Sequence, residues 1–478
     1  MRALRIVRYG GLLFGVTGRV STGMMSRIRA ASVVRARNKE PPLAEAASSH
    51  PTKSAAGPFV TQGGAARLHG GHALGLAAAL LLPLAVLAPK GLSVLLPATA
   101  LLGLAMFWHR HRHLPRIPAT PALIVFGVVV WGAVSAAWSP RAASSLSLSI
   151  ELGVEFLSGL VALGLAMSLA DDERRAVERG AVIGLLGGLA LLFVEWATSG
   201  VLSHAFGSLT GSAGVSFPTV LNRPATIVAL GLWPAGLALW KRSPWLGAAV
   251  AAGAFALVAQ TESMAALVAL FAGAGVFALA RPWPAPTTAF VAATLTAGIV
   301  LAPALATYVL PPLTQIQMSH SVLASVYHRV RIWEFSGHEI AERPISGWGL
   351  NASRHIGEAG AKLRLDREVA ESDPRYQSLR QWFQGEEIDL MPLHPHNAPL
   401  QLWLELGAVG AALGCALILA VTAAVRRQSD RDVKAAWLAQ ITAALLLASI
   451  SFGLWQAWWQ GGLWLTAVFA AAIGRARR

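Results

Sequence analysis

The stretch Leu393-His394-Pro395-His396-Asn397-Ala398-Pro399-Leu400 runs directly into the apolar segment Gln401-Leu402-Trp403-Leu404-Glu405-Leu406-Gly407. A polar, proline-containing sequence therefore meets the start of a hydrophobic helix, as happens at the boundary between water and a membrane. At that boundary His396 presents a titratable imidazole, and a neutral imidazole is a base that can act on a polar substrate carried by a lipid. We therefore expect a candidate site at this boundary.

The composition is typical of a chain that faces lipid. Of the 478 residues, 55% are hydrophobic and only 13% are charged, and the mean hydropathy is positive, which favours a polytopic membrane protein. The formal net charge of +15 would suggest nucleic acid for a soluble protein, but most basic clusters lie between apolar runs, so we expect no nucleic-acid partner. The single cysteine, Cys415, allows neither an intrachain disulfide nor a thiolate metal cage.

Apolar windows long enough to cross about 30 Å of hydrocarbon recur along the chain. They occur near residues 72–89, 91–108, 119–138, 146–170, 181–199, 224–240, 244–260, 263–280, 287–310, 398–425, 434–453 and 460–474. We predict an all-α polytopic membrane protein of about twelve transmembrane helices. Residues 72–310 would form helices 1–9, and residues 398–478 would form helices 10–12 and a basic cytoplasmic tail. Residues 1–71 are expected to be a basic, disordered cytoplasmic leader, with a weak signal sequence as the alternative.

Short basic loops orient the predicted bundle. With the N terminus inside, most Lys and Arg of the short loops fall on the cytoplasmic face, as the positive-inside rule requires. These loops are His109 to His113, Asp171 to Arg179, Lys241-Arg242, Arg281 and Arg426 to Lys434. Residues 311–397 then form one large extracytoplasmic segment between helices 9 and 10. Its length exceeds what a connector needs, so we expect it to fold back over the bundle and to carry site residues.

Two arginines lie on a predicted helix within this segment. Apolar residues at helical spacing predict a helix from Ser321 to Glu342, which Pro344 ends. Such a helix can lie across the membrane surface, and it carries Arg329 and Arg331. A solvated helix face remains the alternative interpretation for either arginine.

A glycine-flanked tryptophan follows this helix. Gly347 and Gly349 on either side of Trp348 predict a tight turn that exposes backbone amides beside an interfacial aromatic ring. Arg354 lies a few residues further on, and it would add a cation on the same side of the membrane.

Arg223 is a second signal, in the sequence Asn222-Arg223-Pro224 at the outer entrance of the sixth predicted span. A guanidinium at this depth is costly unless it meets an anion, which a phosphate would supply. Together with Arg329, Arg331 and Arg354 on the same predicted face, it could clamp a diphosphate through paired hydrogen bonds. Snorkelling of the side chain to the interface is the alternative for Arg223.

The histidine motif also has structural interpretations. His396 is either a catalytic base or an interfacial helix cap. For His394 a structural or substrate-orienting role is favoured over catalysis. Asn397 is a candidate substrate contact, but its side-chain oxygen can instead cap the tenth span.

Three further patterns are given less weight. Asp430-Arg431-Asp432 has the spacing of some metal-holding transferase motifs, but the topology places it in the cytoplasm, where a solvated loop is favoured. The alternating His and Arg from His109 to His113 disfavour a metal, because neighbouring positive charge opposes its binding. Glu151 and Glu155 lie one turn apart in the fourth span, where a packing role and a substrate-contact role both remain open.

Taken together, these segments resemble the O-antigen ligase family, which shares its core with O-antigen polymerases. The resemblance rests on Arg329-Val330-Arg331-Ile332-Trp333, Pro344 to Gly349, His394-Pro395-His396-Asn397 with Leu400, Glu405 and Gly407, Asn222-Arg223, and the turn Trp138-Ser139-Pro140. It extends over roughly residues 72–474. The order of these segments is moderately specific, and ligases and polymerases share it.

The resemblance implies transfer of a glycan from undecaprenyl diphosphate to a sugar hydroxyl of lipid A-core, or of another glycan acceptor. The reaction would take place on the periplasmic face of the bacterial inner membrane, with no metal and no cofactor. Arg223 and Arg329 would stabilise the departing diphosphate, and His396 would act as general base. The expected substrate-binding residues are Arg331, Arg354, His394, Asn397 and Trp348. The family pattern aligns one arginine where this chain has two; the spacing to Trp333 favours Arg329 over Arg331.

Two other functions remain open at this stage. A polymerase would transfer the same donor to a second lipid-linked glycan. A secondary transporter with twelve spans is less favoured, because transporters place polar residues near the bilayer midplane, whereas here the chemistry-bearing residues gather at one face. Glu262, at the outer end of the seventh span, is the residue nearest to an ion site.

Overall fold

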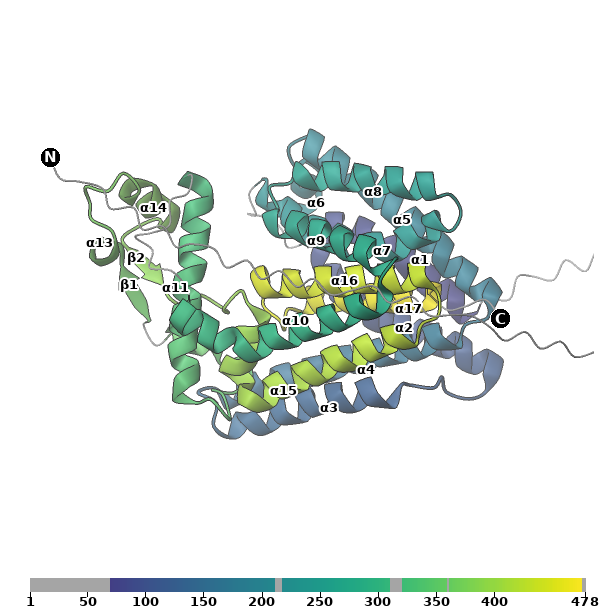
Figure 1. The fold of residues 1–478 in the computed structure, drawn as a ribbon, viewed down its shortest axis with the longest axis horizontal. Helices are drawn as coiled ribbons and strands as arrows, with labels where there is room; N and C mark the ends of the chain where they lie inside the picture. Colours follow the sequence, from purple (N-terminus) through teal and green to yellow (C-terminus); the bar gives the residue numbers. More distant parts are fainter. Residues whose placement is uncertain (1–68, 211–216, 310–319, 359–360, 475–478) are drawn as a thin grey trace, which may run out of the picture. The chain divides into compact units, whose positions relative to one another are not determined.

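The computed structural model describes residues 69–210, 217–309, 320–358 and 361–474 (Figure 1). The predicted leader, residues 1–71, lies outside the described residues except for its last three. The helices are α1 (Gly70–Leu87), α2 (Leu92–His111), α3 (Ala119–Val134), α4 (Ala142–Ser168), α5 (Asp171–Ala197), α6 (Val201–Thr210), α7 (Asn222–Trp240), α8 (Pro244–Ala259), α9 (Met264–Ala280), α10 (Pro284–Ala304), α11 (His320–Glu342), α12 (Ser353–Glu358), α13 (Leu365–Glu368), α14 (Tyr376–Phe383), α15 (Ala398–Arg427), α16 (Arg431–Ile450) and α17 (Ala457–Ile473). Two short strands, β1 (Lys362–Arg364) and β2 (Glu387–Asp389), pair in antiparallel register.

The all-α, polytopic prediction is confirmed. Eight of the described helices are long and apolar enough to cross a membrane: α1 to α5, α10, α15 and α16. The other four predicted windows coincide with α7, α8, α9 and α17, of which α8, α9 and α17 are shorter apolar helices. The chain is therefore a multi-pass membrane protein, and the count of twelve spans stays a prediction.

The closest helix pairing joins α1 to α5 through glycine. Gly180, Gly184 and Gly188 repeat every four residues along α5, so they share one face of that helix. A Cβ at Gly180 would lie 2.0 Å from the carbonyl oxygen of Gly75, and one at Gly184 would lie 2.2 Å from that of Ala78. Small residues let helix backbones approach closely where lipid supplies no hydrophobic drive between helices. The pairing therefore depends on the absence of side chains at these positions.

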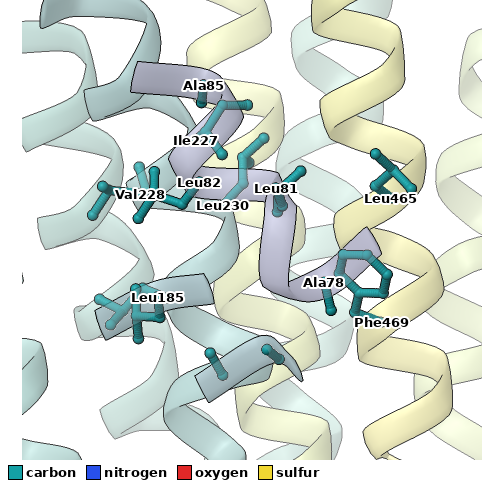
Figure 2. Packing of buried hydrophobic residues seen from close by; sticks show 14 of the residues in the cluster. Ala78, Leu81, Leu82, Ala85, Leu185, Ile227, Val228, Leu230, Leu465 and Phe469 are labelled. Atoms are coloured by element: carbon teal, nitrogen blue, oxygen red, sulfur yellow. The ribbon is translucent and has the colours of Figure 1, made fainter. Parts of the chain in front are cut away.

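A buried apolar cluster packs α1 and α5 against α7 and α17 (Figure 2). The labelled residues are Ala78, Leu81, Leu82 and Ala85 of α1, Leu185 of α5, Ile227, Val228 and Leu230 of α7, and Leu465 and Phe469 of α17. Helices from both ends of the described chain thus pack around α7. This packing fixes the start of α7, where Arg223 lies.

Ion pairs connect the basic loops at one end of the bundle. Asp430 caps α16 by accepting hydrogen bonds from the backbone amides of Asp432 and Val433, and its carboxylate lies 3.6 Å from Lys241. The Asp432 carboxylate accepts a hydrogen bond of 2.7 Å from Arg281. The loops after α7, α9 and α15 therefore share one end, and both aspartates of the Asp-Arg-Asp motif serve a helix cap and ion pairs.

The helix α11 crosses α10 and α15 at the ends that lie away from the basic loops (Figure 1). The predicted helix from Ser321 to Glu342 is confirmed. In its C-terminal half, Ile332 and Ile340 pack against Leu400 and Leu404 of α15. Its N-terminal half packs against α13, α14 and β2 instead, through a cluster that includes Tyr327. This helix therefore connects the bundle to a small helix-and-strand unit.

We predict that Gly184→Ala destabilises the protein by about 1–3 kcal/mol, because the added methyl group must displace the α1 backbone. The matched control is Gly187→Ala on the same helix, where nothing lies within 4 Å of an added Cβ. That change should stabilise the helix by about 0.5–1 kcal/mol. Thermal unfolding in detergent measures both, and equal effects of the two substitutions would contradict the proposed packing.

Candidate functional site

The His396 side chain is held in the tautomer that a general base requires. Its Nδ1 lies 2.6 Å from the carbonyl oxygen of Ser451. A carbonyl only accepts, so Nδ1 carries the proton and Nε2 keeps its lone pair. Burial lowers the pKa of His396, and the nearby charges of Arg329 and His328 lower it further, while the bond to Ser451 opposes this shift. The site therefore holds a neutral, oriented imidazole.

His394 shapes the backbone beneath His396. Its buried ring accepts a hydrogen bond of 3.1 Å at Nδ1 from the backbone amide of His396, whose φ of 53° is left-handed. Burial lowers the pKa of His394 to about 3, with contributions from His396 and Arg354. A Cβ at Gly453 would lie 2.7 Å from the ring. His394 is thus a neutral structural support of the motif.

The loop between α16 and α17 is fastened to α15 by side chains. The Gln401 amide oxygen accepts a hydrogen bond of 2.8 Å from the backbone amide of Leu454. The Glu405 carboxylate accepts one of 2.8 Å from the Trp455 indole. With the bond from His396 to Ser451, these contacts make the loop a fixed wall of the site.

The Glu405 side chain is fully buried, and its carboxylate accepts three further hydrogen bonds. The backbone amide of Asn351 donates at 2.7 Å and the hydroxyl of Ser353 at 2.5 Å, while Gln401 donates at 3.0 Å. A buried carboxylate without a cation needs such a set of donors. Glu405 therefore joins α15, the turn before α12 and the loop before α17 into one support.

The glycine-flanked turn closes a break in α15. Gly407 has φ 62° and ψ −157°, which interrupts the helix. The amides of Trp348 and Gly349 donate hydrogen bonds of 2.8 Å to the carbonyls of Leu404 and Glu405. The predicted tight turn is therefore confirmed, but the expectation that it exposes its amides is wrong, because the break in α15 supplies carbonyls that take them up.

The Trp348 side chain is also engaged by the protein. Its indole donates a hydrogen bond of 2.9 Å to the carbonyl of Glu339, and the Arg343 guanidinium lies 4.0 Å from the ring centroid. Asn397 likewise serves the fold, because its side chain accepts a bond of 3.0 Å from the amide of Leu400 and caps α15. Both residues therefore have a structural role at the edge of the site.

The two arginines of α11 differ in their partners. Arg331 pairs with Glu334 at 2.5 Å and with Glu368. Arg329 is half-buried, and among the described residues its guanidinium has neither a hydrogen bond nor a carboxylate partner. It lies one turn before Trp333, whose indole donates a bond of 2.8 Å to the carbonyl of Pro395. Arg329 therefore brings an uncompensated positive charge beside the His394 to Asn397 motif.

Arg223 reaches the same motif through α17. Its guanidinium lies 5.5 Å from the ring centroid of Trp458, and the Trp458 indole donates a bond of 3.0 Å to the Gln456 side chain. The Gln456 amide nitrogen lies 3.2 Å from Nε2 of His394. Within the described part of the chain, Arg223 also has no carboxylate partner. A chain of contacts thus connects Arg223 to the histidines.

Gln456 and Trp458, which connect Arg223 to the histidines, were not predicted from the sequence. The signal was present as a glutamine and a pair of tryptophans at the start of the last span, but their contact with α7 depends on packing. Arg354, by contrast, is an exposed residue on α12, and its charge contributes to the low pKa of His394. It therefore lies near the motif as a free-standing cation at the surface.

A comparison with known proteins covers part of this arrangement. A family model described as O-Antigen ligase matches residues 248–415, a range that contains α11, the glycine-flanked turn and the histidine motif. This part of the chain is therefore similar to the O-antigen ligase family. The matched range begins after α7, so it does not include Arg223.

Proteins similar to this chain carry a related name. A "Putative polysaccharide ligase" of Rickettsia conorii is 26% identical over 324 residues, which is 66% of this chain and 72% of that protein. One of Rickettsia felis is 25% identical over 352 residues, 72% of this chain and 78% of that protein. These similarities support a membrane enzyme of the polysaccharide ligase type.

We predict that Arg331→Gln lowers the free energy of unfolding by about 1–3 kcal/mol, because it leaves charged partners without their donor. Arg329→Gln, two residues away on the same helix, should leave stability unchanged or raise it, because this guanidinium has no partner to lose. Thermal unfolding of the two purified variants provides the comparison. A larger loss of stability in Arg329→Gln would show that Arg329 is the structural arginine.

Proposed function

We propose that the enzyme transfers a glycan from undecaprenyl diphosphate to a sugar hydroxyl of lipid A-core, without a metal ion. The observation that carries this proposal is the half-buried guanidinium of Arg329, which has no partner among the described residues, near the neutral imidazole of His396. A half-buried cation is stable only where an anion can join it. A diphosphate is such an anion, and a neutral imidazole is the base that an acceptor hydroxyl requires.

The distribution of charge supports a periplasmic site in the inner membrane. Basic residues lie in the loops at one end of the bundle, where Lys241 and Arg281 meet Asp430 and Asp432. The His396 motif precedes α15 at that helix's other end. Because basic loops stay in the cytoplasm, His396 would face the periplasm.

The proposed reaction is a single displacement at the anomeric carbon. The acceptor hydroxyl gives its proton to Nε2 of His396, and its oxygen forms a bond to that carbon. The bond from the carbon to the diphosphate oxygen breaks, and its electron pair leaves with the diphosphate. Arg329 and Arg223 stabilise this growing negative charge, which favours the transition state over the bound donor. The imidazolium then releases its proton to water.

The remaining predicted residues take supporting roles in this proposal. Arg329, rather than Arg331, contacts the diphosphate, because Glu334 and Glu368 already occupy Arg331. Arg354 is exposed and can add a further phosphate or sugar contact. His394, Asn397 and Trp348 set the shape of the site through the bonds described above.

We predict that His396→Ala abolishes transfer while membrane insertion remains intact, since a general base contributes about 10²- to 10⁴-fold in rate. Arg329→Lys should also fail, because an ammonium lacks the planar, two-pronged donor geometry of a guanidinium. The measurement is transfer by purified protein reconstituted with undecaprenyl-linked donor and lipid A-core acceptor, in the presence of a chelator. Near-normal turnover by either variant, or loss of wild-type activity with the chelator, would contradict the proposal.

The acceptor is tested in cells. A strain that lacks this enzyme should make lipopolysaccharide core without O-antigen. A core that carries one repeat unit would instead identify a polymerase.

The pH dependence of kcat/KM follows from the His396 environment. Because burial lowers the pKa of His396 below its usual 6.5, the base is unprotonated at neutral pH. Activity should therefore be level around pH 7 and fall only as the pH drops through this lowered pKa. An acid limb with its midpoint above pH 6.5 would contradict a His396 base.

A further inference from the structure

An aromatic cluster on α11 and α14 has no part in the mechanism above. It consists of Trp382 and Phe383 at the end of α14 and His328 on α11. The ring centroids lie 4.8 Å apart for Trp382 and Phe383, and 5.6 Å apart for His328 and Trp382, with near-perpendicular planes. Trp382 is nevertheless 46% exposed. A large indole face on the outer segment is therefore open to a ligand.

The cluster shares α11 with the proposed catalytic Arg329. The Nε2 of His328 lies 2.7 Å from the carbonyl oxygen of Asp389, so it donates a hydrogen bond and the ring is fixed. His328 precedes Arg329 on α11, and its charge contributes to the lowered pKa of His396. Trp382 therefore contacts the residue that precedes Arg329 on α11.

Polar side chains accompany the exposed ring. Ser378 lies one turn before Trp382 on α14. Gln381 directly precedes Trp382, and Asp389 contacts His328 through its backbone carbonyl; both residues are exposed. A pyranose ring has one face of C–H groups with partial positive charge, and the face of an indole is negative. Hydroxyl groups around the sugar would find a polar partner in Ser378, one turn away on the same helix. This combination fits a sugar better than a purely apolar ligand.

The packing argues against a membrane anchor at Trp382. The side of α14 that is buried contributes Tyr376 and Leu379 to a cluster with Tyr327 of α11 and Ile388 of β2. The half of α11 that packs on the bundle is the other one, through Ile332 and Ile340. Trp382 therefore belongs to the unit that packs on the N-terminal half of α11, and not to the half of α11 that packs on the bundle.

We propose that Trp382 is the stacking platform for one sugar ring of a glycan bound at this site. The inference rests on the proposed function, and it adds a glycan subsite on α14 that extends the site beyond the diphosphate and the attacking hydroxyl. The ring belongs either to the donor glycan or to the acceptor, and the two sources are separated kinetically.

The test compares Trp382→Ala, Trp382→Leu and Trp382→Phe in the full-length reconstituted enzyme. Leu keeps an apolar side chain but removes the aromatic face, whereas Phe keeps that face. The matched control is Trp245→Ala, at an 86% exposed tryptophan at the start of α8. Thermal unfolding confirms that each variant is folded.

We expect Ala and Leu to raise one KM by about tenfold, which corresponds to about 1.4 kcal/mol, with a small change in kcat. Phe should stay close to the wild type, and Trp245→Ala should match it. A raised KM for the donor would assign the ring to the donor glycan, and a raised KM for lipid A-core would assign it to the acceptor. A Leu variant that works like the wild type while Ala fails would indicate an apolar anchor, and unchanged KM values in all variants would equally overturn the platform.

Binding of free oligosaccharide keeps the two proposals distinct. Calorimetry with O-antigen and core oligosaccharides released from their lipids requires no transfer. Weaker binding by Trp382→Ala than by wild type would support the platform even if the reconstituted enzyme transferred nothing. Equal binding by the two proteins would reject it whatever the activity.

Discussion

The buried carboxylate of Glu405 is the interaction on which the site depends. Inside a helix long and apolar enough to cross a membrane, this group must be surrounded by donors, and it receives them from Asn351, Ser353, Gln401 and Trp455. These donors come from three separate segments, so one charge holds α15, the turn before α12 and the loop before α17 together. That loop in turn fixes the tautomer of His396 through Ser451.

The arrangement also explains why positive charge can remain unpaired at the same end. The protein satisfies Arg331 with Glu334 and Glu368 but offers Arg329 no carboxylate among the described residues. An unpaired guanidinium destabilises the free enzyme, and it becomes favourable when a phosphate arrives. We propose that the unpaired Arg329 lowers the stability of the free enzyme and keeps its charge available to the leaving group.

The sequence predicted the helices and the site to different extents. Apolar length located all twelve helical windows, and helical spacing with Pro344 located α11, because these signals are local. Sequence favoured Arg329 over Arg331 only through its spacing to Trp333, because the ion pair of Arg331 with the distant Glu368 of α13 depends on the fold. The amides near Trp348 were misjudged for a related reason: the break at Gly407 that consumes them lies on another helix. Gln456 and Trp458 were missed because only the packing of α17 against α7 gives them their place.

The most direct test of the central claim is a cryo-EM map of the enzyme with undecaprenyl diphosphate bound. The account predicts the diphosphate between the guanidinium groups of Arg329 and Arg223, with Nε2 of His396 facing the position of the attacking hydroxyl. A diphosphate held by Arg331, or bound at the end of the bundle that carries Lys241 and Arg281, would contradict it.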